Sequence, residues 1–322
     1  MRSVILAMAL LANGEAASSG GSCATTPIVD NFRVPQVHTS AGTNNKYTRV
    51  IYRTPAATAT CNKADAPSTT SPDEAASETS YPTDPTTASH WSYDDQENWN
   101  VYGTNNECGH GLNFPTFPGE SPINIIPTAT HLPAEFNKTN PTITMEDYDR
   151  TRTGLPIFNN GHTIGYSVCA NKHGCDLKAK FGTWPKQIRD IEDDNEDEYF
   201  LLQMHWHWGS DDTKGSEHLV CSKPRAAELH LVWLNKNNIT SDRTQPESGL
   251  LLAVTGIMFE GGADQDNPAV ASMIDSIHTK AMPPGNGGTG VSINVKDLLP
   301  TDWQTKFYAY TGSLTTPPCS QV

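Results

Sequence analysis

The pattern of apolar and turn-forming residues predicts a mainly β domain in the last two thirds of the chain. Short β-prone runs are separated by Gly, Pro and Asn, at positions 142–144, 162–168, 200–206, 229–234, 250–259, 291–295 and 307–310. Helical periodicity is rare, and the best candidate helix covers residues 269–280. The predicted fold class is therefore mainly β with a few short helices.

The chain before this domain has a different pattern. Residues 1–17 combine Arg2 with a short apolar run and small residues, which is typical of a secretory signal peptide; the alternative is the start of a buried helix. Residues 18–88 are rich in Ser, Thr, Ala and Pro, which predicts a flexible extension with one strand-like patch at 47–52. We expect the folded domain to cover residues 89–322, and no stretch is long and apolar enough to predict a membrane-spanning helix.

The amino-acid composition limits the classes of binding partner and the cellular compartment that we expect for this protein. The net charge of -14 over 322 residues argues against nucleic acid and anionic membranes as partners. Seven cysteines, with glycosylation sequons at Asn137 and Asn238, predict a secreted or extracellular protein, or one in the lumen of the secretory pathway. The acidic run at 190–198 is expected to be a solvated loop; calcium binding is the alternative, but the EF-hand spacing is missing.

Histidines in two of the predicted strands form a candidate metal site. His205 and His207 flank a tryptophan, and residues two apart on a strand point to the same face. A second strand carries His230, so pairing of the two strands would bring three imidazoles together, which is the ligand set of a catalytic zinc site with one open position. Gln203 and Glu228 each lie two residues before a histidine and are available to orient it. The commoner role of a lone strand histidine is structural, so spacing alone leaves that alternative open.

Seven motifs, in order along the chain, resemble those of the alpha-class carbonic anhydrases. They are His90-Trp91-Ser92-Tyr93, Ser121-Pro122-Ile123-Asn124-Ile125, Asn159-Asn160-Gly161-His162-Thr163, Gln203-x-His205-x-His207-Trp208-Gly209, Gly215-Ser216-Glu217-His218, Ala226-Ala227-Glu228-Leu229-His230-Leu231-Val232, and Tyr310-Thr311-Gly312-Ser313-Leu314-Thr315-Thr316-Pro317-Pro318-Cys319. The resemblance implies a twisted, mostly antiparallel central sheet with Zn²⁺ on His205, His207 and His230. It also implies reversible hydration of CO2 to bicarbonate and a proton, by attack of a zinc-bound hydroxide.

The resemblance implies a role for each residue around the metal. Thr315 would accept a hydrogen bond from the hydroxide and donate its own proton to Glu217, and His162 would be the proton shuttle. The remaining residues would line the cleft: Thr316 beside bicarbonate, Tyr93 and Asn160 in the water network, and Val232, Val254 and Leu314 in the apolar wall that holds CO2.

The resemblance also implies a disulfide between Cys108 and Cys319. Cys169 and Cys175 are close enough in the sequence to pair with each other. Cys23 and Cys61 both lie in the N-terminal region and could pair within it. Cys221 would then be left over.

The sequence departs from the family pattern at two points. Gly165 stands where many members carry Asn or Gln, which removes an expected water contact. Family members continue beyond the position of Val322 with further sheet strands, so we expect an incomplete copy of a longer protein. A non-catalytic matrix or binding module, an inactive fragment, and an esterase or other zinc hydrolase are the alternatives, but the presence of all three histidines favours the carbonic anhydrase.

Overall fold

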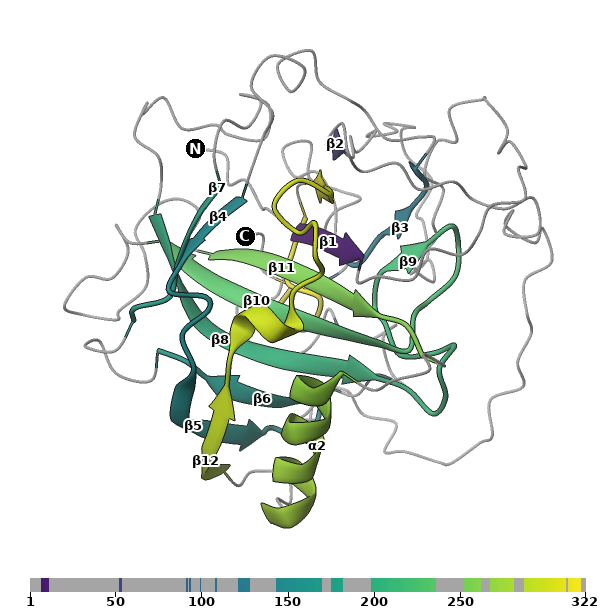
Figure 1. Cartoon of the computed structure of the whole chain (residues 1–322). Coiled ribbons are helices and arrows are strands. Elements are labelled where there is room, and N and C mark those ends of the chain that lie inside the picture. The colour runs from purple at the N-terminus through teal and green to yellow at the C-terminus, as the bar shows by residue number, and fades with distance from the viewer. Residues whose placement is uncertain are drawn as a thin grey trace.

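One large sheet organises the molecule in the computed structural model (Figure 1). The structure describes residues 7–11, 52–53, 91, 93, 99, 108, 121–127, 143–169, 175–181, 198–235, 252–261, 267–280, 287–310 and 312–319. The strands of the large sheet are β1 (Ala7–Leu11), β2 (Tyr52–Arg53), β4 (Ile143–Glu146), β5 (Arg152–Asn159), β6 (Ile164–Ser167), β7 (Lys178–Phe181), β8 (Glu198–Trp208), β10 (Ala227–Asn235), β11 (Leu252–Phe259), β12 (Gly287–Ile293) and β13 (Phe307–Tyr310). A separate pair is formed by β3 (Asn124–Ile125) and β9 (Leu219–Val220).

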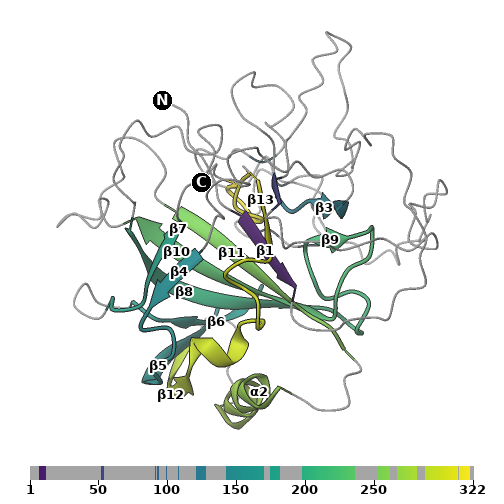
Figure 2. The ribbon, with the colours of Figure 1, turned by 45° about the horizontal axis from the view of Figure 1, so that its top comes forward.

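The large sheet is mostly antiparallel, which confirms the predicted fold class. Its strand order is β12-β5-β6-β8-β10-β11-β1-β13-β2, with β7 also paired to β8 and β4 paired to β7. The only parallel pairings among the described strands are β1 with β11 and β3 with β9. Helix α2 (Pro268–Lys280) contains the predicted helix and lies at the β12 side of the sheet (Figure 2), where the short helix η6 (Val295–Leu298) also packs.

The long central strands follow the apolar pattern of the sequence. On β10 the side chains of Leu229, Leu231 and Trp233 are fully buried in the main hydrophobic core, which makes this face of the strand apolar. The side chains between them face the other side of the sheet, because successive residues of a strand alternate. β10 therefore separates the core from the candidate site.

An irregularity in β8 changes which of its residues face the core. Val232 of β10 is opposite Gln203, but Trp233 is opposite Leu201, so Leu202 is an extra residue in β8. Its carbonyl oxygen accepts hydrogen bonds from the backbone N–H groups of Val168 and Cys169. Odd-numbered residues before this bulge pack in the core, whereas even-numbered residues do so after it; these core residues are Tyr199, Leu201, Met204 and Trp206.

Strand β5 was not predicted, because its sequence contains Gly154 and Pro156. Proline has no N–H to donate and is tolerated in a sheet at irregular positions. The register between β12 and β5 shifts between the pairs Gly288–Ile157 and Val291–Leu155, which flank Pro156. The missing donor therefore falls where the ladder is interrupted.

The N-terminal residues that the structure describes take part in the sheet. β1 lies within the predicted signal peptide and pairs in parallel with β11 and antiparallel with β13. β2 begins at Tyr52, the last residue of the strand-like patch predicted at 47–52, and it pairs with β13. The signal peptide stays a prediction, while the rest of the predicted extension, the sequons at Asn137 and Asn238 and residues 190–197 lie outside the described residues.

Disulfides join distant and neighbouring parts of the chain. One links Cys108 to Cys319, the pair that the resemblance implied, and another links Cys169 to Cys175. Cys221 is also disulfide-bonded, so the expectation that it is left over was wrong; Cys23 and Cys61 lie outside the described residues. Spacing and resemblance missed this bond because neither contains information on which segments meet at Cys221.

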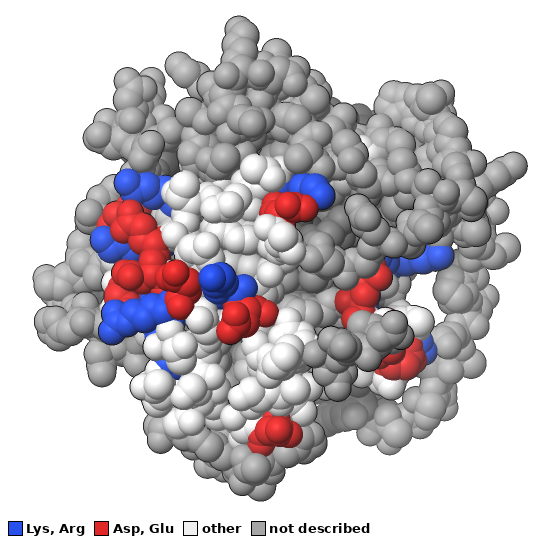
Figure 3. Space-filling view, in the orientation of Figure 1, with Lys and Arg blue, Asp and Glu red and all other residues white. Residues whose placement is uncertain are grey.

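The described surface carries charges of both signs. Figure 3 shows acidic and basic side chains intermixed near the edge formed by β4 and β7. The Nζ atom of Lys178 lies 3.4 Å from Glu198 Oε1, and the Nη1 atom of Arg150 lies 2.8 Å from Asp176 Oδ2. Of the helices that the structure describes, none has the length and apolar character needed to cross a membrane.

Candidate metal centre

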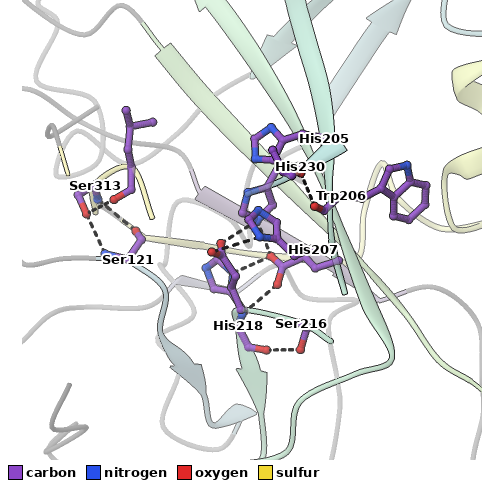
Figure 4. Close-up of polar contacts among 12 residues, drawn as sticks. Ser121, His205, Trp206, His207, Ser216, His218, His230 and Ser313 are labelled. Carbon is purple, nitrogen blue, oxygen red and sulfur yellow. Dashed lines mark hydrogen bonds and ion pairs between the residues drawn. The ribbon is translucent and has the colours of Figure 1, made fainter. Parts of the chain in front are cut away.

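Three histidines meet on the face of the sheet opposite the core. His205 of β8 is directly opposite His230 of β10, and His207 is opposite Glu228. The ring centroids lie 5.1 Å apart for His205 and His207, 5.2 Å for His205 and His230, and 4.5 Å for His207 and His230. Figure 4 shows the three rings gathered together, while Trp206 points to the other side of β8. One nitrogen from each ring lies within 4.8 Å of the others, so the three can share one ion.

Carboxyl and amide groups hold the outer nitrogens of these rings. Gln203 Oε1 lies 2.9 Å from His205 Nδ1, and Glu228 Oε1 lies 2.8 Å from His230 Nε2. Glu217 Oε1 lies 3.3 Å from His207 Nδ1. These contacts leave His205 Nε2, His207 Nε2 and His230 Nδ1 for a metal, and metal-bound histidines usually have such partners.

The buried His207 ring tests whether a metal fits. Only 7% of His207 is exposed, and its Nε2 has no hydrogen-bond partner among the described residues. A buried polar atom without a partner costs free energy, and this cost is removed when the nitrogen binds an ion. Imidazole nitrogen is a preferred ligand of zinc, so the donor set fits Zn²⁺.

The environment favours the neutral form of His205 and His207, which is the form in which an imidazole binds a metal. Burial, followed by the charge of His230, lowers the pKa of His205 to about 3. Burial and the neighbouring histidines also lower the pKa of His207 well below its usual range. Burial alone would raise the pKa of Glu228, but His218 and His230 outweigh it and lower that pKa well below its usual range. Glu228 is therefore an ionised carboxylate behind His230.

Behind the three histidines lies a hydrogen-bond network that the sequence reasoning missed. Glu228 Oε1 also lies 2.7 Å from His218 Nδ1, and Glu228 Oε2 accepts a 2.9 Å hydrogen bond from the His218 backbone N–H. His218 Nε2 lies 2.6 Å from the Tyr310 hydroxyl, which donates to Ser121 Oγ at 2.9 Å. The Ser121 hydroxyl in turn accepts from the Ser313 backbone N–H at 3.1 Å. His218, Ser121 and Tyr310 stood in the recognised motifs, which was the available signal for their role.

Thr315 and Glu217 are brought together beside the imidazoles. The Thr315 hydroxyl hydrogen-bonds the Glu217 carboxyl group. Burial, with the nearby Glu228 charge, raises the pKa of Glu217 well above its usual range even though this hydrogen bond lowers it. Glu217 thus contacts both Thr315 and His207 from the loop that follows β8.

Comparison with known protein families identifies the family that this arrangement of residues is typical of. Residues 94–322 match the family model of the eukaryotic-type carbonic anhydrases. The chain belongs to this family. The prediction drawn from the seven motifs is confirmed.

Individual carbonic anhydrases are similar over most of the same region. The chain is 29% identical over 239 residues to carbonic anhydrase 6 of Homo sapiens, a match that covers 72% of this chain and 67% of that protein. It is 27% identical over 231 residues to carbonic anhydrase 12 of Homo sapiens, covering 69% of this chain and 56% of that protein. It is 31% identical over 172 residues to carbonic anhydrase 15 of Mus musculus, covering 51% and 47%. The chain thus spans only about half to two thirds of the length of these relatives.

The carbonic anhydrase site opens into a cleft of about 280 Å³. All of the residues expected in the apolar wall and beside bicarbonate line it: Val232, Val254, Leu314 and Thr316. Val232 is opposite Val254 on neighbouring strands, and only 5% of Val232 is exposed. The cleft therefore has an apolar side next to the ligand strands.

His162 lies at the cleft with its ring stacked on Trp91. The two ring centroids are 3.5 Å apart with an interplanar angle of 9°. The ring centroid of Tyr93 lies 6.1 Å from that of His162. Asn160 Oδ1 accepts hydrogen bonds from the backbone N–H groups of His162 at 3.0 Å and Thr163 at 2.8 Å. Asn160 thus shapes the turn that carries His162, a contact that the expected water-network role did not include.

Proposed function

We propose that this chain is a zinc-dependent carbonic anhydrase that catalyses the reversible hydration of CO2 to bicarbonate and a proton. The single observation that carries the proposal is the convergence of His205, His207 and His230, with each outer nitrogen held by a polar side chain. In carbonic anhydrases, zinc on three imidazoles lowers the pKa of a bound water to about 7, which supplies hydroxide to attack CO2.

The surrounding residues orient the reactants. When Glu217 is ionised, the Thr315 hydroxyl donates its hydrogen bond to that carboxylate, so the Thr315 oxygen is left as an acceptor only on the side of the cleft. It therefore selects a nucleophile that still carries a proton and directs a lone pair of that nucleophile away from Thr315. Val232, Val254 and Leu314 form an apolar surface suited to CO2, which is a weak hydrogen-bond acceptor, and Thr316 offers a hydroxyl to bicarbonate.

The proton produced by hydration has to leave the cleft. His162 lines the cleft, and an imidazole with an ordinary pKa near 6.5 both accepts and releases a proton near neutrality. His162 as a whole is partly exposed, but its Nε2 is buried and its ring is stacked on Trp91, so exchange of a proton with solvent through Nε2 requires the ring to move. We assign His162 as the proton shuttle.

The compartment proposed for the protein is the extracellular space or the lumen of the secretory pathway. Cys108, Cys319, Cys169, Cys175 and Cys221 are all disulfide-bonded, and disulfides persist in oxidising compartments. Carbon dioxide and bicarbonate are the expected small-molecule partners there.

The test is stopped-flow CO2 hydration by the full chain together with its zinc content. We expect about one zinc per chain and measurable turnover, and we expect His207→Ala to lose both. Ile274→Ala, a change of an exposed side chain on α2, is the control and should keep both. Zinc binding without turnover would contradict the enzyme and favour a non-catalytic binding module.

A further inference from the structure

A row of facing residues crosses the sheet at the metal centre. Phe158 of β5 is opposite Gly165 of β6, and Gly165 is opposite His205 of β8. His205 is opposite His230 of β10, which is opposite Gly256 of β11. Directly paired residues project from the same face of a sheet, so Phe158 lies on the same face as the two histidines, with only a glycine between it and His205.

The Phe158 ring fills the space above that glycine. A Cβ atom added to Gly165 would lie 2.2 Å from Phe158 Cζ and 2.7 Å from the Met204 carbonyl oxygen. The ring therefore extends along the row toward His205 instead of rising straight from β5. A side chain at position 165 and the present position of the Phe158 ring exclude each other.

Phe158 faces the cleft and is not part of the protein interior. It lines the same cavity as His205, His162 and Val254, and neither of the two hydrophobic clusters among the described residues includes it. In the strand order, β5 lies two strands from β8 on one side of the ligand pair, and β11 lies next to β10 on the other. The cleft thus has an aromatic wall on the β5 side and an aliphatic wall on the β11 side.

We propose that Phe158 is a specificity-determining residue, whose ring binds the flat apolar group of a carboxylate held at the three histidines. This inference rests on the proposed function, because a carboxylate shares its anionic CO2 group with bicarbonate and is placed by the same centre. The ring attached to an aromatic carboxylate then lies against the Phe158 ring, which itself covers Gly165, and offset or edge contacts between aromatic rings are favourable. Acetate has no group that reaches Phe158, so it serves as the matched ligand.

The experiment begins with the zinc content of the full chain and of Phe158→Ala and Phe158→Tyr. Isothermal titration of benzoate and acetate into each protein then measures the two Kd values. We expect Phe158→Ala to raise the Kd of benzoate about fivefold while that of acetate stays unchanged, a factor within the range of single aromatic contacts. Phe158→Tyr keeps the ring and should keep the benzoate affinity of the unchanged protein.

Each outcome decides one of the two proposals. Absence of zinc from the unchanged protein would overturn the proposed function, and this inference with it. Bound zinc with equal benzoate affinity in the unchanged protein and Phe158→Ala would overturn the role of Phe158 alone. Should Phe158→Ala fail to fold, the unchanged protein still decides, because benzoate binding no tighter than acetate would refute an aromatic wall.

Discussion

At the scale of single residues, Glu228 connects the metal centre to the protein behind it. Its carboxylate faces three donors, which are the Nε2 of His230 and the Nδ1 and backbone N–H of His218. Its pKa is lowered well below the usual range, so it stays ionised and accepts from all three. Both imidazole orientations therefore depend on one side chain.

Glu228→Gln should weaken zinc binding about 10- to 100-fold, the usual effect of losing a partner of a metal-bound histidine. The glutamine amide has only one oxygen, so its N–H₂ group would face one of the three donors. Zinc affinity measured by competition with a chromogenic chelator tests this. Gln203→Ala is the comparison, because it removes a neutral partner from His205 alone and should have a smaller effect. An unchanged zinc affinity in Glu228→Gln would contradict the role given to the carboxylate.

Acid should destabilise the metal-free protein in the range where free histidine titrates. The pKa of His205 is lowered to about 3 in the folded state, whereas an unfolded histidine titrates near 6.5. Below about pH 6.5 the unfolded chain takes up a proton that the folded protein does not, so this contribution to stability is present above 6.5 and is lost as pH falls toward 3.

Urea unfolding in the presence of a chelator, from pH 7 to pH 5, measures this pH dependence. We expect the midpoint to fall over this range, and to fall less steeply in His205→Gln, which lacks the titrating ring. Glu228 has its own acid-sensitive window, but that window begins lower, near the ordinary pKa of glutamate. Parallel pH dependences in the two proteins would show that His205 is not buried as described.

At the scale of elements, the contact between β5 and β6 depends on the absence of a side chain at Gly165. Gly165→Ala should lower the free energy of unfolding by about 1–3 kcal/mol, the usual cost of overpacking. The double variant Gly165→Ala with Phe158→Ala removes the clash with the ring but keeps the one with the Met204 carbonyl oxygen. We therefore expect partial rescue, measured as a coupling in a double-mutant cycle by urea unfolding. Strictly additive losses would indicate that the ring does not occupy this space.

The sequence pattern predicted the elements that carry continuous apolar runs. β8, β10 and β11 were found because Leu, Val, Ile and aromatic residues dominate them. β5 was missed because Gly154 and Pro156 are poor strand formers, and β7 because Lys178 and Lys180 make half of it charged. In both cases pairing with neighbouring strands outweighs local preference.

The candidate site was predictable as a set of ligands but not as a network. His205 and His207 share a face by strand geometry alone, and the apolar pattern placed His230 on a second strand, while the family motifs implied that it is the third ligand. The register that places His205 opposite His230 is a tertiary property, as is the contact of His218 with Tyr310, 92 residues away along the chain. Such contacts arise from strand pairing, which local periodicity does not encode.

At the scale of the whole molecule, the two described disulfides close loops of very different size. Cys108–Cys319 spans 211 residues, whereas Cys169–Cys175 spans 6. Loop-closure entropy gives about 5 kcal/mol for the longer loop and about 2 kcal/mol for the shorter one, and native strain commonly reduces such values. Replacing both cysteines of the longer bridge by serine should therefore lower the free energy of unfolding more than the same change in the shorter bridge. Chemical denaturation under non-reducing conditions compares the two, and a reversed order would contradict the entropic argument.

The extra residue in β8 also determines which deletions this strand can tolerate during evolution. Leu202 is what turns the odd-numbered residues of the strand from the core to the cleft, since Leu201 packs in the core and His205 does not. Deletion of Leu202 would give a regular alternation in which Leu201, Met204 and Trp206 still face the core and the histidines still face the cleft. Deletion of a residue after the bulge, such as Met204, would instead direct His205 and His207 into the interior. A point substitution in β8 alters one side chain, whereas deletion of a residue after the bulge exchanges the two faces of the rest of the strand at once. We therefore expect related chains to differ in the residue types of this strand, and to keep the number of residues between Gln203 and Trp208 constant.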